Sequence, residues 1–209
     1  TTRTSHYLMD DYDAVMNHLK RVGINNAPSD KVKALFIPSY LNGDDGIFNT
    51  RYYDLLVGMD LTVFPSYYEP WGYTPLESLA FGVPTTTTSL AGLGLWVEDH
   101  YGKTHPGISI IERNDSNYSS VVDGVVERIK EMSALSSGEM NKYRRNARSV
   151  SEIAMWDKNI KYYKEAYAMA LNKVAEAKSS YARMGDETVH SFEEVERSRP
   201  SWTSIFIGR

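Results

Sequence analysis

Cysteine is absent from this sequence of 209 residues. A chain without it forms no disulfide framework, no thiolate metal site and no cysteine nucleophile, and such a composition favours a reducing cytoplasm. Long hydrophobic runs are missing as well. No apolar stretch approaches the roughly 18 residues that a membrane helix needs, and the polar residues 1–6 contain no signal-peptide core. We therefore expect a cytoplasmic protein with no membrane partner.

Basic residues are not in excess, since 23 Lys and Arg stand against 27 Asp and Glu, for a formal net charge of −4. Binding to a phosphate backbone needs a basic surface, so nucleic acid is not expected as a partner. The five histidines show no metal-ligand spacing, and we predict no metal site. A composition of 42% hydrophobic and 24% charged residues is typical of one or two ordinary globular domains.

The first half of the chain alternates between strand-like and helical patterns. Short β-branched or aromatic runs predict strands at 32–37, 60–66, 84–89 and 107–111. Helices are expected at about 10–22, 50–59, 75–82 and 93–100. Connections of this length are too long for hairpins and are typical of βαβ units. The expected fold class is therefore α/β with a Rossmann-like parallel sheet.

From residue 116 onward the pattern becomes helical only. Apolar residues recur at helical spacing from 121 to 132, and two further helices are expected at about 138–155 and 157–178. These patterns divide the chain into a partial Rossmann-like domain at 1–135, C-terminal helices at 136–178 and an irregular tail at 179–209. Doubly wound domains usually carry about six strands, so four predicted strands indicate part of a larger unit.

The loop after the second predicted strand carries the richest chemistry. Ligands of open α/β sheets bind beyond the carboxyl ends of the strands, where this loop lies. Residues 65–77 read PSYYEPWGYTPLE, with two carboxylates eight positions apart that can reach opposite ends of one ligand. Gly72 allows a ligand to approach the backbone, and Tyr73, Thr74 and Leu76 are expected to offer free N–H groups where a helix begins. This arrangement predicts an anion site that can hold a diphosphate without a metal.

This loop resembles the E-x7-E region of retaining glycosyltransferases with the two-Rossmann GT-B fold. More narrowly, the string PSYYEPWGYTP is similar to the signature of the animal and fungal type of glycogen synthase, and the similarity extends from about residue 31 to Trp156. The resemblance implies that the sheet belongs to the C-terminal domain of a GT-B fold. It also implies a transfer of glucose from UDP-glucose to an α-1,4-glucan with retention at the anomeric carbon.

Carried over residue by residue, the resemblance makes Glu69 the catalytic carboxylate that contacts the donor glucose and Glu77 the one that binds the ribose hydroxyls. Tyr52, which lies 17 positions before Glu69, would stack on uracil. The sugar and the diphosphate would be lined by Trp71, Gly72, Tyr73 and Thr74. The implied mechanism is a front-face attack within an ion pair, with the donor as the substrate and no cofactor or metal.

The sequence departs from the family pattern in its cations. Between Leu61 and Trp96 there is no Lys or Arg, whereas the family clamps the diphosphate with an Arg and a Lys that would precede Thr1. The N-terminal Rossmann domain would precede it too, so we expect this chain alone to transfer no glucose. Eukaryotic members carry an arginine-rich helix that senses glucose 6-phosphate. This chain has a thinner basic face at that place, and a solvated helix surface explains it better than a regulatory site does: Lys142, Arg144, Arg145 and Arg148.

Simpler structural explanations compete with several of these roles. The helix dipole alone favours a Glu at position 77, and Trp71 and Tyr73 could be core or rim aromatics. Tyr53 suits the role of Tyr52 equally well by periodicity. Two other functions also stay open. One is a retaining GT-B transferase that uses a different nucleotide sugar, and the other is a non-catalytic module that binds nucleotide or glucan. The sequence leaves a homo-oligomer open.

Overall fold

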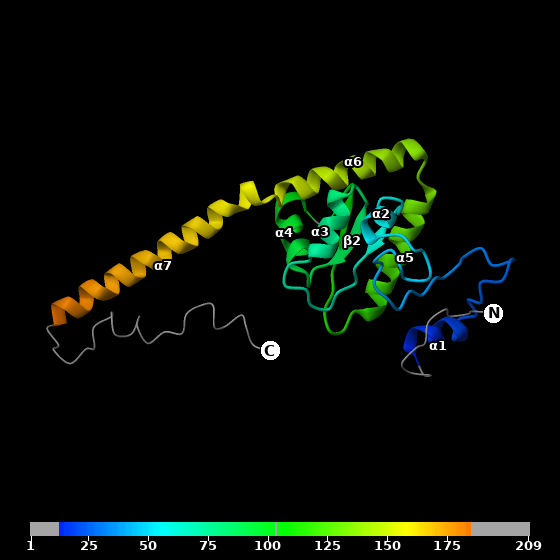
Figure 1. Cartoon of the computed structure of the whole chain (residues 1–209), viewed down its shortest axis with the longest axis horizontal. Helices are drawn as coiled ribbons and strands as arrows, with labels where there is room; N and C mark the ends of the chain where they lie inside the picture. The colour runs from blue at the N-terminus through cyan, green and yellow to red at the C-terminus, as the bar shows by residue number, and fades with distance from the viewer. Residues whose placement is uncertain (1–12, 103, 185–209) are drawn as a thin grey trace. The chain divides into compact units, whose positions relative to one another are not determined.

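The computed structural model describes residues 13–102 and 104–184. One compact unit ends at Ala154, and a second begins at Met155. The first unit contains the helices and strands from α1 to α6, and the second contains α7 (Figure 1). Their bounds are α1 Ala14–Arg21, α2 Tyr52–Leu56, β1 Thr62–Val63, α3 Tyr73–Ala80, β2 Thr85–Thr88, α4 Gly92–Tyr101, β3 Thr104–His105, β4 Ile108–Ile111, α5 Tyr118–Ala134, α6 Ser137–Ile153 and α7 Trp156–Met184.

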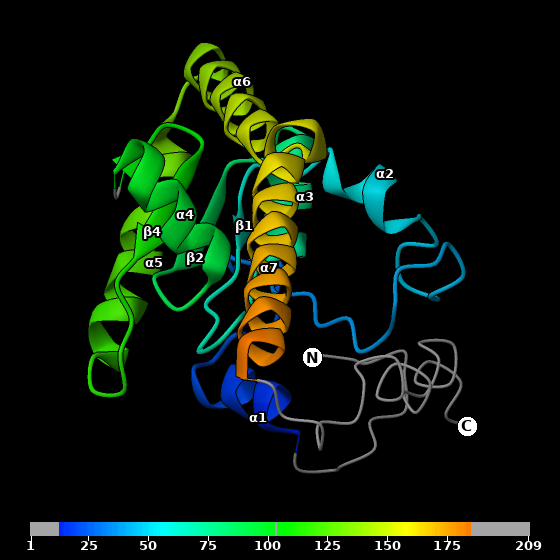
Figure 2. The same cartoon turned by 90° about the vertical axis from the view of Figure 1, so that its left-hand side faces the viewer.

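The sheet has the strand order β1-β2-β4-β3, and Figure 2 shows β1, β2 and β4 in this sequence. β1 pairs with β2 in parallel, with Thr62 opposite Thr85, and β2 pairs with β4 in parallel, with Thr85 opposite Ile108. β3 pairs with β4 in antiparallel orientation. The parallel α/β class and three of the four predicted parallel strands are therefore confirmed.

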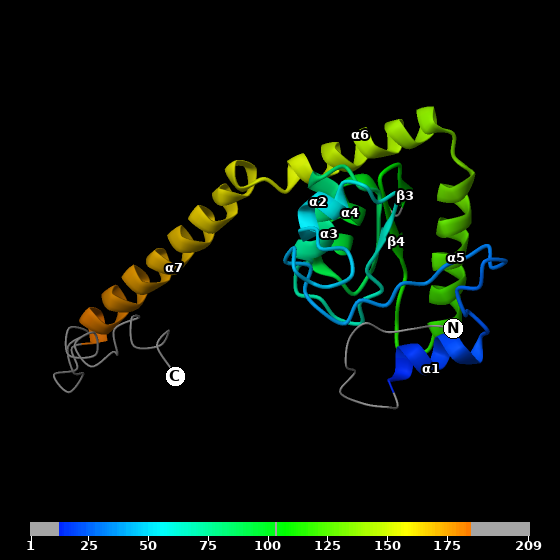
Figure 3. The ribbon, with the colours of Figure 1, turned by 45° about the vertical axis from the view of Figure 1, so that its right-hand side comes forward.

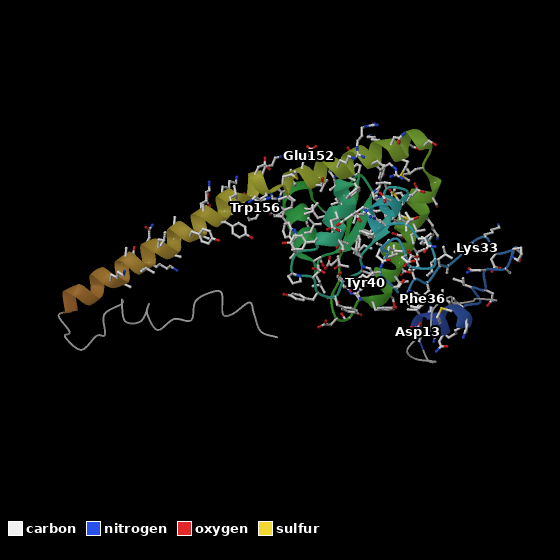
Figure 4. The ribbon with its side chains drawn as sticks, in the orientation of Figure 1. Asp13, Lys33, Phe36, Tyr40, Glu152 and Trp156 are labelled. Atoms are coloured by element: carbon white, nitrogen blue, oxygen red, sulfur yellow. The ribbon has the colours of Figure 1, made fainter. Side chains whose placement is uncertain are left out.

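The segment predicted as the first strand, 32–37, is irregular, so that prediction is wrong. The side chain of Asn26 occupies both backbone groups of Ala34: its Nδ2 donates to the Ala34 carbonyl at 2.8 Å, and its Oδ1 accepts from the Ala34 N–H at 2.9 Å. Leu35 and Ile37 line an apolar cavity beside β1 instead of pairing with it. Figure 4 labels Lys33 and Phe36 of this segment, and Tyr40, which follows it.

Helices cover both faces of the sheet, with α3 and α4 on one side of β4 and α5 on the other (Figure 3). The side chains of β4 alternate between the helices on the two sides of the sheet. Ile108 and Ile110 join a buried core with residues of α3, α4 and α6, whereas Ile111 lies against Gly124 of α5. All four threonines of β2 are buried because this central strand has a covered sheet face on each side.

The C-terminal helices begin close to their predicted positions. A capping box starts α6, because the Ser136 side chain accepts from the Glu139 N–H while the Glu139 carboxylate accepts from the Ser136 N–H. α7 continues to Met184, beyond the predicted end at residue 178, and residues 185–209 of the expected tail lie outside the described part. Within the described ranges, no helix combines the length and the apolar character that crossing a membrane requires.

Candidate functional site

The loop between β1 and α3 lies at the carboxyl edge of the parallel strands. It follows Val63, the last residue of β1, and ends where Gly72 caps α3. The segments after β2 and β4 reach the same edge, because all three strands run in the same direction. This edge is where open α/β sheets bind ligands, and it brings residues 65–77 next to the start of α4 and the end of β4.

Backbone hydrogen bonds fix Glu69 beside the start of α4. The Glu69 N–H donates to the Leu90 carbonyl at 3.2 Å, and the Glu69 carbonyl accepts from the Gly92 N–H at 3.0 Å. Two residues further on, the Trp71 carbonyl accepts from the Leu93 N–H at 2.6 Å. Glu69 and Ala91 thus form an isolated parallel bridge, which adds a short strand-like pairing to the sheet edge.

Two glycines allow the loop to come this close. Gly72 has φ +110°, a conformation that side chains rarely adopt, and a Cβ there would lie 3.6 Å from Cγ of Glu69 and 3.0 Å from Cγ of Pro75. Gly92 faces the loop from α4, where a Cβ would lie 2.3 Å from the Pro70 carbonyl oxygen. The two backbones therefore pack in direct contact, and sequence reasoning missed the part played by Gly92.

The first turn of α3 presents two backbone donors. No acceptor from the described residues is recorded for the N–H groups of Tyr73 and Thr74, which precede the first helical hydrogen bond. The Leu76 N–H donates to the Gly72 carbonyl at 3.2 Å, so the expectation that it would be free is wrong. Both Tyr73 and Thr74 are exposed, and Tyr73 has 71% of its surface accessible.

The remaining predicted residues of the loop differ in burial. Glu69 is half-buried, directly before the turn, and Glu77 is half-buried one turn into α3. Trp71 is also half-buried and packs against the core, with its ring in an edge contact with Trp96 at 5.8 Å. This position makes Trp71 part of the support of the loop. Tyr73 and Thr74 offer far more surface to a ligand.

Tyr52 and Tyr53 lie on α2, with their ring centroids 5.2 Å apart. Tyr52 lines the apolar cavity beside β1, which has a volume of about 430 Å³, and burial raises the pKa of its hydroxyl. Tyr53 stacks on Phe81 at 5.0 Å, and a hydrogen bond to the Glu77 carboxylate raises the pKa of the Tyr53 hydroxyl. The structure therefore brings both tyrosines to α3, and the contact of Tyr53 with Glu77 was not foreseen.

Arg113 is the functional candidate that the sequence analysis missed. It lies two residues after the end of β4, has only 6% of its surface exposed, and donates from Nη1 to the Pro65 carbonyl at 2.7 Å. Its Cζ lies 3.4 Å from the centre of the Tyr67 ring. The available signal was its position, because the residue after a parallel strand reaches the same edge as the loop of Glu69.

The basic face of α6 is divided between structural and exposed side chains. Nη2 of Arg144 donates to the Met59 carbonyl at 2.8 Å and lies 3.0 Å from Oδ1 of Asp60, so this residue ties α6 to the segment before β1. Arg148 lies against Gly82, whose Cβ would meet its Nε at 2.7 Å. Lys142 and Arg145 are exposed. In the described ranges, no group of three or more His, Asp or Glu is arranged to hold a metal ion.

A sequence model described as glycogen synthase matches residues 2–204. The chain belongs to the glycogen synthase family. Glycogen [starch] synthase isoform 2 of Saccharomyces cerevisiae is 33% identical over 174 residues, which cover 81% of this chain and 24% of the yeast protein. The liver glycogen [starch] synthase of Mus musculus is 30% identical over 172 residues, with the same two coverages. The chain thus spans about a quarter of the length of these glycogen synthases, and the predicted resemblance is confirmed.

Proposed function

We propose that this chain is the nucleotide-sugar-binding part of a glycogen synthase that transfers glucose from UDP-glucose to the non-reducing end of an α-1,4-glucan with retention. One observation carries the proposal: Glu69, Gly72 and the open first turn of α3 lie together at the carboxyl edge of the parallel strands. The relatives from yeast and mouse, which are named glycogen [starch] synthase, support the same reaction class.

In this proposal, the diphosphate of the donor binds at the start of α3. The N–H groups of Tyr73 and Thr74 donate to its oxygens, the Thr74 hydroxyl adds a third donor, and the positive end of the helix dipole favours the negative charge. Both residues are exposed, so the ligand reaches them without any rearrangement of the fold. These donors hold the leaving group during the reaction and require no metal ion.

Glu69 then lies at the reacting end of the donor. Breaking the glycosidic bond to the diphosphate builds positive charge on the sugar ring, which a fixed carboxylate stabilises. Its backbone N–H and carbonyl are bound to Leu90 and to Gly92 at the start of α4, so the backbone that carries the carboxylate is held in place before the substrate arrives. Glu69 acts here by position and charge. The diphosphate, held at the other side of the turn, accepts the proton of the attacking glucan hydroxyl.

The nucleoside would extend along α3 toward α2. Glu77 accepts hydrogen bonds from the ribose hydroxyls, and Tyr52 stacks on uracil. Glu77 already interacts with the Tyr53 hydroxyl, and Tyr52 lies beside Tyr53 at a ring distance of 5.2 Å. Tyr52, Tyr53 and Glu77 therefore lie near one another between α2 and α3, along the path proposed for the nucleoside.

We also propose that catalysis needs a second Rossmann domain and that this chain alone transfers no glucose. The chain covers 24% of the yeast and mouse relatives, so most of such an enzyme lies in sequence that this chain does not match. Incubation of the purified chain with UDP-glucose and glycogen is expected to release no UDP. Measurable elongation of the glucan by the chain would contradict this expectation.

Calorimetric titration with UDP and with ADP tests the donor site on this chain. We expect heat with UDP that ADP does not reproduce. Tyr52→Ala is expected to weaken UDP binding about tenfold, the range for loss of one stacked base, whereas Tyr53→Ala serves as the neighbouring control and should weaken it less. Equal binding of UDP and ADP would favour a different nucleotide sugar. Equal effects of the two substitutions would remove the stacking role of Tyr52.

A Glu69→Gln substitution in a complete glycogen synthase that contains this chain tests the catalytic role. The amide keeps the size of the side chain and removes its charge. We expect loss of glucose transfer with UDP binding retained. Unchanged synthesis would refute the catalytic role of Glu69. Retained UDP binding together with no transfer by the wild-type enzyme would favour the non-catalytic binding module.

A further inference from the structure

Arg113 is a buried cation at the edge of the proposed donor site. Its side chain is enclosed, and within the described residues it forms no ion pair with a carboxylate. Burying a charge is costly unless the group is compensated by hydrogen bonds or by another interaction. Two contacts with one short stretch of chain compensate the buried charge of Arg113: a hydrogen bond to the Pro65 carbonyl and a cation–π contact with the Tyr67 ring.

These two contacts belong to a series of interactions that fix the loop between β1 and α3 to residues on or next to β2, β4 and α4. The Pro65 carbonyl accepts from Arg113 at 2.7 Å, and the next carbonyl, of Ser66, accepts from the Thr88 hydroxyl at 2.8 Å. The Tyr67 ring covers the guanidinium, and Glu69 is then held by Leu90 and by Gly92 at the start of α4. Arg113 is thus the anchor for the first part of the loop, and no other Lys or Arg of the described chain is recorded in contact with it.

Hydrogen bonds to the end of β2 also fix the backbone of Arg113, from which the anchoring side chain extends. The Arg113 N–H donates to the Ser89 hydroxyl at 3.0 Å, and the Ser89 N–H donates to the Ile111 carbonyl at 3.0 Å. The side chain therefore crosses from the end of β4, past the end of β2, to the loop after β1. One residue connects the carboxyl ends of all three parallel strands.

We propose that Arg113 is a positioning residue of the donor site, which holds the loop of Glu69 through Pro65 and Tyr67. This inference rests on the proposed function for the identification of a donor site, but the anchoring of the loop by Arg113 can be measured without any nucleotide. The guanidinium contacts the Pro65 carbonyl and the Tyr67 ring, and it touches no position where the donor is proposed to bind. Arg113 therefore affects donor binding only through the position of the loop.

Amide hydrogen exchange of the 209-residue chain tests whether Arg113 anchors the loop between β1 and α3. We expect Arg113→Met to speed exchange of the Glu69, Gly92 and Leu93 amides about tenfold or more, because a hydrogen bond from a buried, charged donor to the Pro65 carbonyl is lost. Arg113→Lys keeps the charge and one donor and should restore part of the protection. Exchange at α5 and α6 is expected to stay within twofold, which separates a local hold from a general loss of stability.

Arg144→Met is the matched control, because Arg144 also binds a backbone carbonyl, that of Met59. It should speed exchange near Met59 and leave the Glu69 and Gly92 amides unchanged. Tyr67→Leu gives a second variant in case Arg113→Met does not fold. Tyr67 has 59% of its surface exposed, so its loss spares the core, and we expect at least a threefold faster exchange of the Glu69 amide.

The same variants titrated with UDP separate this inference from the proposed function. UDP binding by the wild-type chain that falls about tenfold in Arg113→Met, together with faster loop exchange, supports both. Faster loop exchange without any UDP binding by the wild-type chain supports the anchoring role of Arg113 and refutes a donor site formed by this chain alone. Loop amides in Arg113→Met and Tyr67→Leu that exchange within twofold of the wild type would overturn the role of Arg113.

Discussion

Replacing Gly92 by alanine should disturb the loop of Glu69 from the opposite side. The backbone conformation of Gly92 is not left-handed, so the substitution adds no strain of its own at this residue. The added Cβ would instead lie 2.3 Å from the Pro70 carbonyl oxygen and 3.2 Å from Cα of Trp71. Both partners are backbone atoms, so the contact can be relieved only if the loop moves away from α4.

The expected cost is about 1–3 kcal/mol, the usual penalty for inserting a methyl group into a well-packed place. For a unit of this size, that free energy lowers Tm by roughly 2–12 °C. The movement also lengthens the bonds of Gly92 to Glu69 and of Leu93 to Trp71, now 3.0 Å and 2.6 Å. We therefore expect UDP affinity to fall about tenfold or more as the loop is displaced.

Gly138→Ala provides the control, because it adds the same methyl group to a helix where nothing lies within 4 Å of the new Cβ. It should raise the stability by about 0.5–1 kcal/mol, since alanine restricts the unfolded chain and favours the helix. Differential scanning calorimetry and UDP titration of both variants provide the measurements. A Gly92→Ala protein with the Tm and UDP affinity of the wild type would refute the steric argument.

Three further predictions concern other parts of the chain. UDP binding is expected to be the same in EDTA as with added Mg²⁺, because backbone N–H groups supply the proposed diphosphate site; a metal-dependent titration would contradict this. Arg144→Met should lower the free energy of unfolding by about 1–2 kcal/mol through loss of its bonds to Met59 and Asp60, with UDP affinity within twofold; the exposed Arg145→Met is its control in thermal unfolding. Burial opposes the charge of Glu131, but hydrogen bonds from Arg128 and Tyr143 outweigh it and lower its pKa below the usual 4.5. Ionised Glu131 therefore stabilises the fold above that pH and loses this effect as the pH falls through the lowered value, so the Tm difference between wild type and Glu131→Gln should shrink from about pH 7 to about pH 3.

The pattern of apolar residues was sufficient to predict the strands and helices whose burial depends on the local sequence. The runs that became β1, β2 and β4 are apolar or β-branched, with helical patterns between them, and this combination allows few other topologies. The segment 32–37 has the same composition, but the partner of its backbone is a side chain, Asn26. Composition indicates that a segment suits a strand, and it does not indicate which group will satisfy its N–H and carbonyl groups.

β3 escaped prediction because two residues give no periodic signal. The turn of Pro106 and Gly107, with φ +122° at the glycine, was the only local sign of an antiparallel pairing with β4. Arg113 was missed for a related reason. Its contacts with Pro65 and Tyr67 cross 48 and 46 positions of sequence, and only the parallel order of the strands brings them together.

The candidate site was predictable where its chemistry lies in one continuous segment. Glu69, Gly72, Tyr73 and Thr74 lie in one turn, so the sequence order already places them together. Trp71 was harder, since an aromatic ring beside a glycine can face either a ligand or the core, and here it packs against Trp96 and the core. The choice depends on α4, which comes later in the chain.

The loop between β1 and α3 is held mainly through its own carbonyl oxygens. Those of Pro65, Ser66, Glu69 and Trp71 accept from donors that lie outside the loop, on or next to β2, β4 and α4. Any amino acid supplies the same carbonyl, so the shape of this loop is largely independent of the side chains on its outer surface. Tyr68 and Tyr73, with 79% and 71% of their surfaces exposed, can therefore change without loss of the backbone geometry. Evolution or design can alter what the surface recognises while the turn that positions Glu69 is inherited unchanged.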